Sequence, residues 1–518
     1  MAIIDYLTKL NPFGDSPTTF IATWIAVFWA WHIVSQFLPS DSSKPPVVFH
    51  VFPFIGSTVT YGMAPYEFFA KQRSIHGDTF TFILLGRRIT VFLGPAGNDF
   101  VFNGKLAYIN AEDAYTPLTT PVFGKEVVYD VPNHVLMEQK KFVKFGMSIE
   151  NFKKYVPLIV DEVKQYINTS PAFGAGKLDH GETPLMKAMP EITIFTASRT
   201  LQGQEVRDGF DASFADLYHD LDKGFTPINF LAPWLPLPAN RKRDKAQRKM
   251  AQTYSAIVEK RRATGEDPAQ DMIWNLMNQT YKDGRALNDT EIAGIMIALL
   301  MAGQHTSAAT SAWILLHLAE QNGLVERLFE EQKSVIGTDK DGKLKDLDYE
   351  HLKDLPLLNY CIRETLRMHP PLHSIMRKVT KDLPIPNSKW HVPKGHYVMA
   401  APGASAMDAE FFPAPDAFQP ERWFNKKDTE DTEKIDYGYG LVSKGAASPY
   451  LPFGAGRHRC IGEQFAYLQL GTIISTFVRE LEFKLPQGHK VAEQDFTSMV
   501  VLPMAPASIE WKKRAVQA

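Results

Sequence analysis

The sequence predicts a mainly α-helical protein with a minor β component and one N-terminal membrane helix. Two short apolar segments, residues 79–84 and 89–93, have the length of strands, whereas helical spacing of apolar residues dominates from about residue 138 onward. Near the N-terminus, residues 19–38 carry no charge and are long enough to cross a bilayer. No internal repeat or low-complexity tract interrupts this pattern.

Composition narrows the class of protein. The chain has 518 residues, a net charge of −2 and 22% charged residues, so it lacks the basic field of a nucleic-acid binder. Its length alone suggests several domains of roughly 150 residues, but no clean linker follows residue 53, and we expect one body over 54–518. Only Cys361 and Cys460 are present, which excludes a disulfide framework and fits a reducing, cytosolic setting for that body.

The N-terminal region divides into a segment at 1–18, the apolar stretch 19–38 and a proline-containing lead at 39–53. A signal peptide is the alternative to an anchor. The stretch, however, lacks a basic leading segment and ends in Pro39 without a small-residue cleavage site, so an uncleaved anchor is favoured. Lys9 and Lys44 leave the positive-inside count tied, and charge does not give the orientation.

Residues 224–240 form an irregular apolar segment with four prolines. Such a segment should not face bulk water, and the sequence leaves two readings open: a buried loop or a contact with the bilayer. The basic run 241–245 that follows is interpreted as the solvated face of a helix, because apolar residues recur behind it at helical spacing.

One very long helix is expected next. Asn288 and Glu291 have the spacing of a capping box, and they open an apolar run over 292–319. A second membrane span is the rival interpretation. Against it, the polar residues 304–307 would lie at mid-membrane at a cost of several kcal/mol, so a buried core helix with a polar notch is predicted.

That notch has the residue types of a proton relay. Gly303 thins the helix, and Thr306 can turn its hydroxyl toward the preceding carbonyls, which would let water approach the backbone. A hydroxyl next to an ionisable side chain can pass protons into a dry pocket. His305 and Thr306 are therefore the catalytic candidates, although a lone histidine is often only a core residue.

Cys460 lies in the glycine-rich loop 453–462, just before the apolar segment 465–478. A helix start offers free N–H groups and a positive dipole end, which favour a thiolate, and a thiolate can bind iron. The alternative is a structural cysteine. Gly454 and Gly456, however, allow the backbone to pass close to a bulky group.

Three neighbouring side chains could donate hydrogen bonds to anions beside that group. They are Arg457, His458 and Arg459. A haem with two anionic propionates meets both demands of the loop.

The pattern F-x-x-G-x-H-x-C-x-G resembles the haem-binding signature of the haem-thiolate monooxygenases, the cytochromes P-450. The resemblance implies their fold, with a long helix over haem b and Cys460 as the axial iron ligand, whose thiolate favours O–O cleavage. It also implies electrons from NADPH through a separate flavin reductase. Ala302-Gly303-x-x-Thr306 is similar to the family's central-helix motif.

Two departures from the wider family agree with each other. His458 stands where arginine is usual, and His305 where an acidic residue is common; both are typical of the sterol 14α-demethylases. The stretch 115–141 closely resembles the fungal members, and the charged segment 425–434 is similar to their surface insertion.

This branch implies three successive oxygenations of the 14α-methyl of lanosterol or eburicol, with release of formate, in ergosterol biosynthesis. It further implies azole inhibitors as ligands, a single-pass location in the endoplasmic reticulum membrane and a cytosolic catalytic domain. Residues 224–240 would contact the membrane at the substrate entrance.

The resemblance also carries over individual residues. Haem contacts would come from Tyr115, Tyr129, Lys140, Arg377, His458, Gly456 and Gly303. Substrate-pocket positions would be Leu118, Val122, Phe123, Ala302, His373, Ser374, Ile375, Met499 and Val500. A structural triad would comprise Glu364, Arg367 and Arg422. Cations not engaged with haem would dock the acidic reductase, the candidates being Lys140, Lys141, Lys144, Arg457 and Arg459.

Other interpretations remain open from the residues alone. Each apolar pocket candidate could equally be plain core packing. The chain could also be a haem-thiolate hydroxylase of another lipid or a foreign compound, or a non-catalytic haem or sterol binder.

Overall fold

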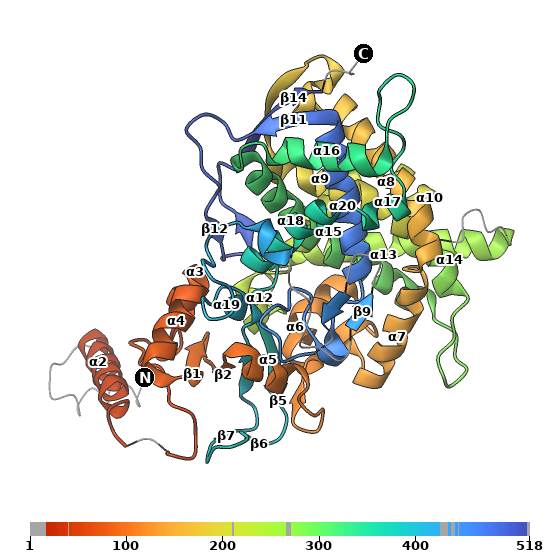
Figure 1. The fold of residues 1–518 in the computed structure, drawn as a ribbon. Coiled ribbons are helices and arrows are strands. Elements are labelled where there is room, and N and C mark those ends of the chain that lie inside the picture. Colours follow the sequence, from red (N-terminus) through yellow and green to blue (C-terminus); the bar gives the residue numbers. More distant parts are fainter. Residues whose placement is uncertain are drawn as a thin grey trace.

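The computed structural model describes residues 17–39, 41–209, 212–265, 271–424, 434–436, 441–443 and 445–514. Helices dominate, and small sheets lie at the periphery (Figure 1). The mainly α architecture with minor β structure is as predicted. The expected insertion at 425–434 lies almost entirely outside the described residues.

The helices follow one another along the described chain. They are α2 (Pro17–Ser35), α3 (Thr58–Met63), α4 (Pro65–His76), α5 (Gly94–Phe102), α6 (Glu112–Phe123), α7 (Asn133–Phe145), α8 (Ile149–Thr169), α9 (Leu185–Ala197), α10 (Gln204–Asp208), α11 (Ala212–Asp222), α12 (Pro227–Leu231), α13 (Pro238–Thr264), α14 (Met272–Met277), α15 (Asp289–Glu320), α16 (Leu324–Ile336), α17 (Tyr349–Lys353), α18 (Pro356–Met368), α19 (Pro402–Ala406) and α20 (Glu463–Glu480). Short helical turns are η1 (Val128–Asp130), η2 (Pro171–Gly176), η3 (Ser198–Gln202), η4 (Pro420–Trp423) and η5 (Gly456–His458).

The strands are short. They are β1 (Thr79–Leu84), β2 (Arg87–Phe92), β3 (Ile109–Asn110), β4 (His180–Pro184), β5 (Ile375–Val379), β6 (Leu383–Pro384), β7 (His391–Val392), β8 (Tyr397–Ala400), β9 (Lys434–Asp436), β10 (Leu441–Ser443), β11 (Leu481–Lys484), β12 (Gln494–Asp495), β13 (Leu502–Pro503) and β14 (Ser508–Lys513).

The larger sheet has the order β1-β2-β8-β5-β3, and it joins early and late parts of the chain. β2 and β8 pair in parallel, whereas the other neighbours are antiparallel. β1 coincides with the predicted strand 79–84, and β2 begins two residues before the predicted 89–93. The sheet thereby brings β5, which carries the candidate site residues Ile375 and Arg377, next to β3 from the N-terminal third.

The predicted long helix is α15, and it forms the centre of the body (Figure 1). Its capping box is present: the Asn288 side chain accepts from the Glu291 N–H at 2.8 Å, and the Glu291 carboxylate accepts from the Asn288 N–H at 2.8 Å. α15 is long and apolar enough to cross a membrane, but it is mostly buried in protein. It packs against α6, α9, α13, α18 and α20, so the core-helix interpretation is confirmed.

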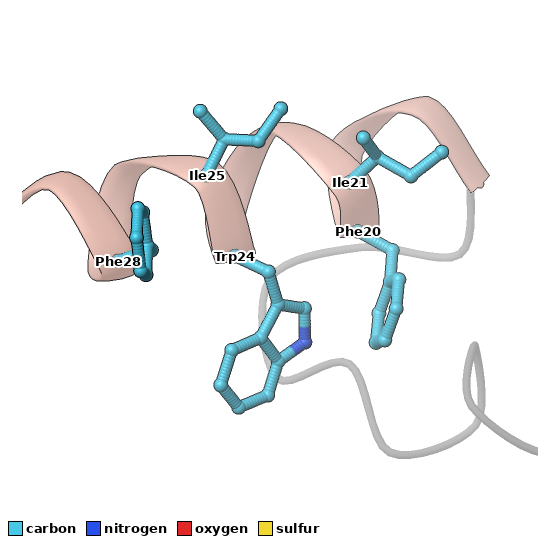
Figure 2. Close-up of a pocket in the computed structure, with 5 residues that line it drawn as sticks. All are labelled: Phe20, Ile21, Trp24, Ile25 and Phe28. Atoms are coloured by element: carbon cyan, nitrogen blue, oxygen red, sulfur yellow. The ribbon is translucent and has the colours of Figure 1, made fainter. Parts of the chain in front are cut away.

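α2 has the opposite environment. Its apolar side chains are exposed, and Figure 2 shows one such face, lined by Phe20, Ile21, Trp24, Ile25 and Phe28. A helix that is apolar all round and uncovered by protein is suited to lipid. It is a candidate membrane span that ends at Ser35, slightly before the predicted residue 38.

The end of α2 is hydrogen-bonded to the lead that follows it. The Gln36 amide donates to the His50 carbonyl at 2.8 Å and accepts from the His50 N–H at 3.0 Å. The Trp29 indole donates to the Val51 carbonyl at 2.7 Å. The lead 39–53 is therefore attached to the helix it follows.

Candidate active site

The Cys460 loop is fixed by backbone contacts. The Cys460 N–H donates to the Phe453 carbonyl at 3.0 Å, and Gly454 and Gly456 have φ angles of 68° and 64°. A Cβ on Gly456 would come within 2.6 Å of the Phe102 carbonyl oxygen. Glycine is thus required there for two reasons: a left-handed backbone and the close approach of α5.

The Cys460 side chain faces an internal space. It is exposed, yet the surrounding protein is dense enough for burial to raise the pKa of its thiol, aided by the Glu463 carboxylate. The Gly462 N–H, Lys140 and Arg459 act in the opposite direction but do not prevail. The sequence predicted that the loop alone would favour a thiolate. In the folded protein the thiol keeps its proton more firmly, and a coordinated metal ion would remove that proton.

A second internal surface lies on α15. Ala302 is exposed and Gly303 and Thr306 are half-buried, although most of the helix on either side is buried. A Cβ added to Gly303 would meet no described atom within 4 Å. α15 packs against α20, which begins three residues after Cys460. Open space at both elements is what a flat cofactor held between them requires.

The polar candidates Tyr115, Tyr129, Arg377 and His458 lie together. The Tyr115 and Tyr129 rings are 5.3 Å apart, and the Tyr129 and His458 rings 6.3 Å. Burial, reinforced by Arg377, lowers the pKa of His458 to about 3, so its ring is neutral. Arg377 is only 4% exposed; it donates to the Met376 carbonyl at 2.8 Å, and it forms none of the ion pairs found among the described residues. A buried cation without a counter-ion, beside phenols, fits an anionic group such as a haem propionate.

Lys140 has partners that the sequence did not indicate. Its Nζ donates to the carbonyls of Arg457 at 3.1 Å and Arg459 at 2.8 Å, so it holds the backbone on both sides of His458. Of the proposed docking cations, Arg459 is paired with Glu463 at 2.7 Å and Arg457 donates to the Gly104 carbonyl at 3.2 Å. Lys141 and Lys144 are exposed on α7.

His305 is paired with a carboxylate from another helix. Its Nε2 lies 2.6 Å from Oδ1 of Asp222, the last residue of α11. The Thr306 hydroxyl donates to the Ala302 carbonyl at 3.0 Å, as expected, but α15 stays a continuous helix through this turn. Sequence reasoning missed Asp222, because the two residues are 83 positions apart and only the fold brings them together.

The structure brings the predicted triad together. Glu364 accepts from Arg367 at 2.9 Å and from Arg422 at 2.8 Å, and Glu364 and Arg367 have no exposed surface. Glu364 also accepts from the Trp423 indole at 3.0 Å and the Gln419 N–H at 3.1 Å, two partners absent from the sequence prediction. The carboxylate is therefore fully used in fixing α18 to η4.

The substrate-pocket candidates come from four places in the fold. α6 packs against α15 and β5, and α15 packs against β13. These elements or the loops beside them carry Leu118, Val122, Phe123, Ala302, His373, Ser374, Ile375, Met499 and Val500. The group is uneven, since Met499 is 44% exposed whereas Val122 is fully buried in the main core. Burial also lowers the pKa of His373 to about 4.

Comparison with known proteins identifies the family. The family model described as cytochrome P450 matches residues 45–511. The chain belongs to the cytochrome P450 family. This P450 is 57% identical over 492 residues to the lanosterol 14-alpha demethylase of Schizosaccharomyces pombe, a match that covers 95% of this chain and 98% of the relative. It is 52% identical to the sterol 14-alpha demethylase of Gibberella zeae, with 97% and 96% covered.

A more distant solved structure has the same fold. Retinoic-acid-bound cyanobacterial CYP120A1 aligns with a TM-score of 0.75 at 20% identity, over 92% of this chain and all of that one. The P450 family implies a haem whose iron is held by a cysteine thiolate. The residues fit that group: an accessible thiol, open space on α15 and a buried cation without a counter-ion. In the described part of the chain no cluster of three or more His, Cys, Asp or Glu offers a different metal site.

Proposed function

We infer that this P450 is a sterol 14α-demethylase. The observation that carries the inference is the identity of 51–57% with fungal lanosterol and sterol 14-alpha demethylases over nearly the whole chain. The matched stretches cover 95–99% of this chain. By comparison, a P450 at 20% identity supports the fold alone.

Haem b would be held by the Cys460 thiolate on iron and by Tyr115, Tyr129, Arg377 and His458 around the propionates. When bound, the haem supplies the activation of O₂ for oxygen insertion. Lys140 would contribute by fixing the backbone of the cysteine loop, because both of its described hydrogen bonds go to that loop. Gly456 and Gly303 would leave room for the macrocycle on either side.

Protons would enter through the Asp222–His305 pair. His305 Nε2 and Asp222 Oδ1 are within hydrogen-bond distance at 2.6 Å, and the Thr306 hydroxyl lies on the next residue of α15. Each oxygenation consumes O₂, two electrons from NADPH and two protons, and one oxygen atom leaves as water. Three rounds would take the 14α-methyl to alcohol, to aldehyde and to formate, leaving a double bond in the sterol nucleus.

The surroundings support a membrane-derived sterol. We propose that α2 anchors the chain as a single span in the endoplasmic reticulum membrane, with the catalytic domain cytosolic and a separate flavin reductase as electron donor. Residues 224–240 would rest on the bilayer, because Trp234 and Ile228 are exposed beside the buried Phe230. Azole inhibitors would compete for the sterol pocket.

The test is reconstitution of the full-length protein with reductase and NADPH in lipid vesicles that contain lanosterol or eburicol. Formate and the 14-demethylated sterol are expected from at least one of them, and Cys460→Ser is the control that should give neither. If both sterols return unchanged while the carbonyl-bound reduced spectrum is of the thiolate type, the sterol assignment is wrong. A monohydroxylated product from another lipid would then favour the broader hydroxylase function.

A further inference from the structure

Two residues on one face of α11 lie against His305. Tyr218 and Asp222 are four residues apart, so they lie on the same side of that helix. Asp222 contacts His305, and the Tyr218 ring lies 6.1 Å from the His305 ring at an interplanar angle of 35°. A single helical turn therefore presents both a carboxylate and a phenol to one histidine of α15.

The Tyr218 hydroxyl is buried without a protein partner. The residue is 3% exposed, and its hydroxyl oxygen makes no hydrogen bond to any described residue. A buried hydroxyl left unpaired destabilises the fold, and native structures nearly always satisfy such groups, often with an ordered water. A ring needed only for packing would be served by phenylalanine without that cost.

The neighbours of the hydroxyl are polar. Burial, together with Asp222 and Tyr254, raises the pKa of Tyr218 well above its usual range, so the phenol stays a hydrogen-bond donor. Tyr254, on α13, donates to Oε1 of Gln202 at 2.6 Å and keeps its own oxygen lone pairs for another donor. Gln202 donates in turn to the Met296 carbonyl of α15 at 3.0 Å. The titratable groups that face Tyr218 are thus Asp222, His305 and Tyr254.

We infer that Tyr218 is a positioning residue of the proton relay: its hydroxyl holds an ordered water against the Asp222 carboxylate and so fixes the acceptor that orients His305. The inference rests on the relay role proposed for Asp222 and His305. His305 Nε2 and Asp222 Oδ1 lie 2.6 Å apart, so the orientation of the carboxylate sets the geometry in which the two atoms share a proton. A second hydrogen bond to the carboxylate keeps its oxygens from rotating away from that nitrogen.

The first test is Tyr218→Phe, which removes the hydroxyl and keeps the ring. Haem content, the carbonyl-bound reduced spectrum and the sterol dissociation constant should stay within about twofold of wild type. The fraction of NADPH electrons released as hydrogen peroxide should rise on the order of threefold, and the pH profile of coupling should shift. Unchanged coupling at every pH overturns the inference.

Tyr166→Phe is the matched control. It also deletes a buried phenol hydroxyl, one that donates to Glu191 at 2.6 Å between α8 and α9. Its coupling should equal that of wild type. Equal peroxide release from both variants would mean that Tyr218 has only a general structural role, against the inference.

Two further measurements separate the positioning role from the sterol assignment. A crystal structure that resolves waters should place one between the Tyr218 hydroxyl and Asp222, whichever substrate the enzyme uses; its absence overturns the inference. In a cycle with Asp222→Asn, the double variant should be no less coupled than Asp222→Asn alone, because both changes act through one carboxylate. Independent, multiplying losses would contradict it.

Discussion

The carboxylates of Glu364 and Asp222 differ in burial and in the number of their partners. Glu364 is fully buried and accepts from Arg367 and Arg422 as well as from an indole and a backbone N–H. Asp222 makes one polar contact to His305, and both side chains of that pair are 29% exposed. Redundant partners fix a geometry, whereas a single accessible partner can exchange a proton. Glu364 thus fixes α18 to η4, whereas the role proposed for Asp222 is proton transfer.

The largest effect is expected from replacing Cys460, the proposed iron ligand. Cys460→Ser should abolish the thiolate-type spectrum of the reduced, carbonyl-bound protein and lower turnover by about a hundredfold or more, because the axial thiolate is lost. Haem content and visible spectroscopy are the measurements. A spectrum identical to wild type would rule out Cys460 as the ligand.

The next effect tests how much the buried carboxylate of Glu364 stabilises the fold. Glu364→Gln removes the charge between the buried Arg367 and the partly buried Arg422 and should lower the free energy of unfolding by about 3–5 kcal/mol. Glu421→Gln is the control, since Glu421 pairs with Arg327 on the surface at 3.1 Å and should change stability by about 1 kcal/mol or less. Denaturant unfolding of the haem-loaded protein measures both. Equal effects of the two substitutions would remove the distinction between the two carboxylates.

Replacing Asp222 should lower turnover without changing stability. Asp222→Asn should reduce product formation by roughly tenfold to a hundredfold, with the carbonyl-bound spectrum and sterol binding retained. Asp220→Asn, on the same helix but paired with Lys223 near the surface, is the control. Product formation by Asp222→Asn at the wild-type rate would show that the pair carries no protons.

The smallest effect concerns the free energy of unfolding at acidic pH, which depends on two buried histidines. His317 and His369 share a hydrogen bond of 2.8 Å between their Nε2 atoms. Burial lowers the pKa of His317 to about 3 and that of His369 well below its usual range. Both are neutral when folded and protonated when unfolded below about pH 6.5, so stability should fall as pH drops below that value, by about 1.4 kcal/mol per pH unit for each histidine.

His317→Gln should make the dependence of the free energy of unfolding on pH shallower by the contribution of one histidine. The measurement is the free energy of unfolding between pH 6.5 and 5, set against that of wild type. A slope unchanged by the substitution would mean that His317 is not neutral in the folded protein.

Local patterns were readable from the sequence. The capping box at Asn288, the strand at 79–84 and the loop around Cys460 depend on residues close together in the chain. The triad was also assembled correctly, but only through the family resemblance, because E-x-x-R alone is an ordinary helical pair.

Contacts between distant segments were not readable. The partnership of Asp222 with His305 depends on the fold that brings the end of α11 to α15, and nothing in the local sequence of either helix indicates it. The same holds for Lys140 on the carbonyls of the cysteine loop. The raised pKa of the Cys460 thiol was missed because it depends on enclosure by the whole fold, which outweighs the local dipole.

The paired hydrogen bonds between Gln36 and His50 bear on how this enzyme meets its substrate. A flexible tether would let the body tumble above a bilayer, whereas a clasp at the end of α2 restricts its tilt. With α2 in the membrane, encounters with sterol become a two-dimensional search. The quantity that saturates such an enzyme is the mole fraction of sterol in the lipid, and dilution of the vesicles should leave its rate unchanged.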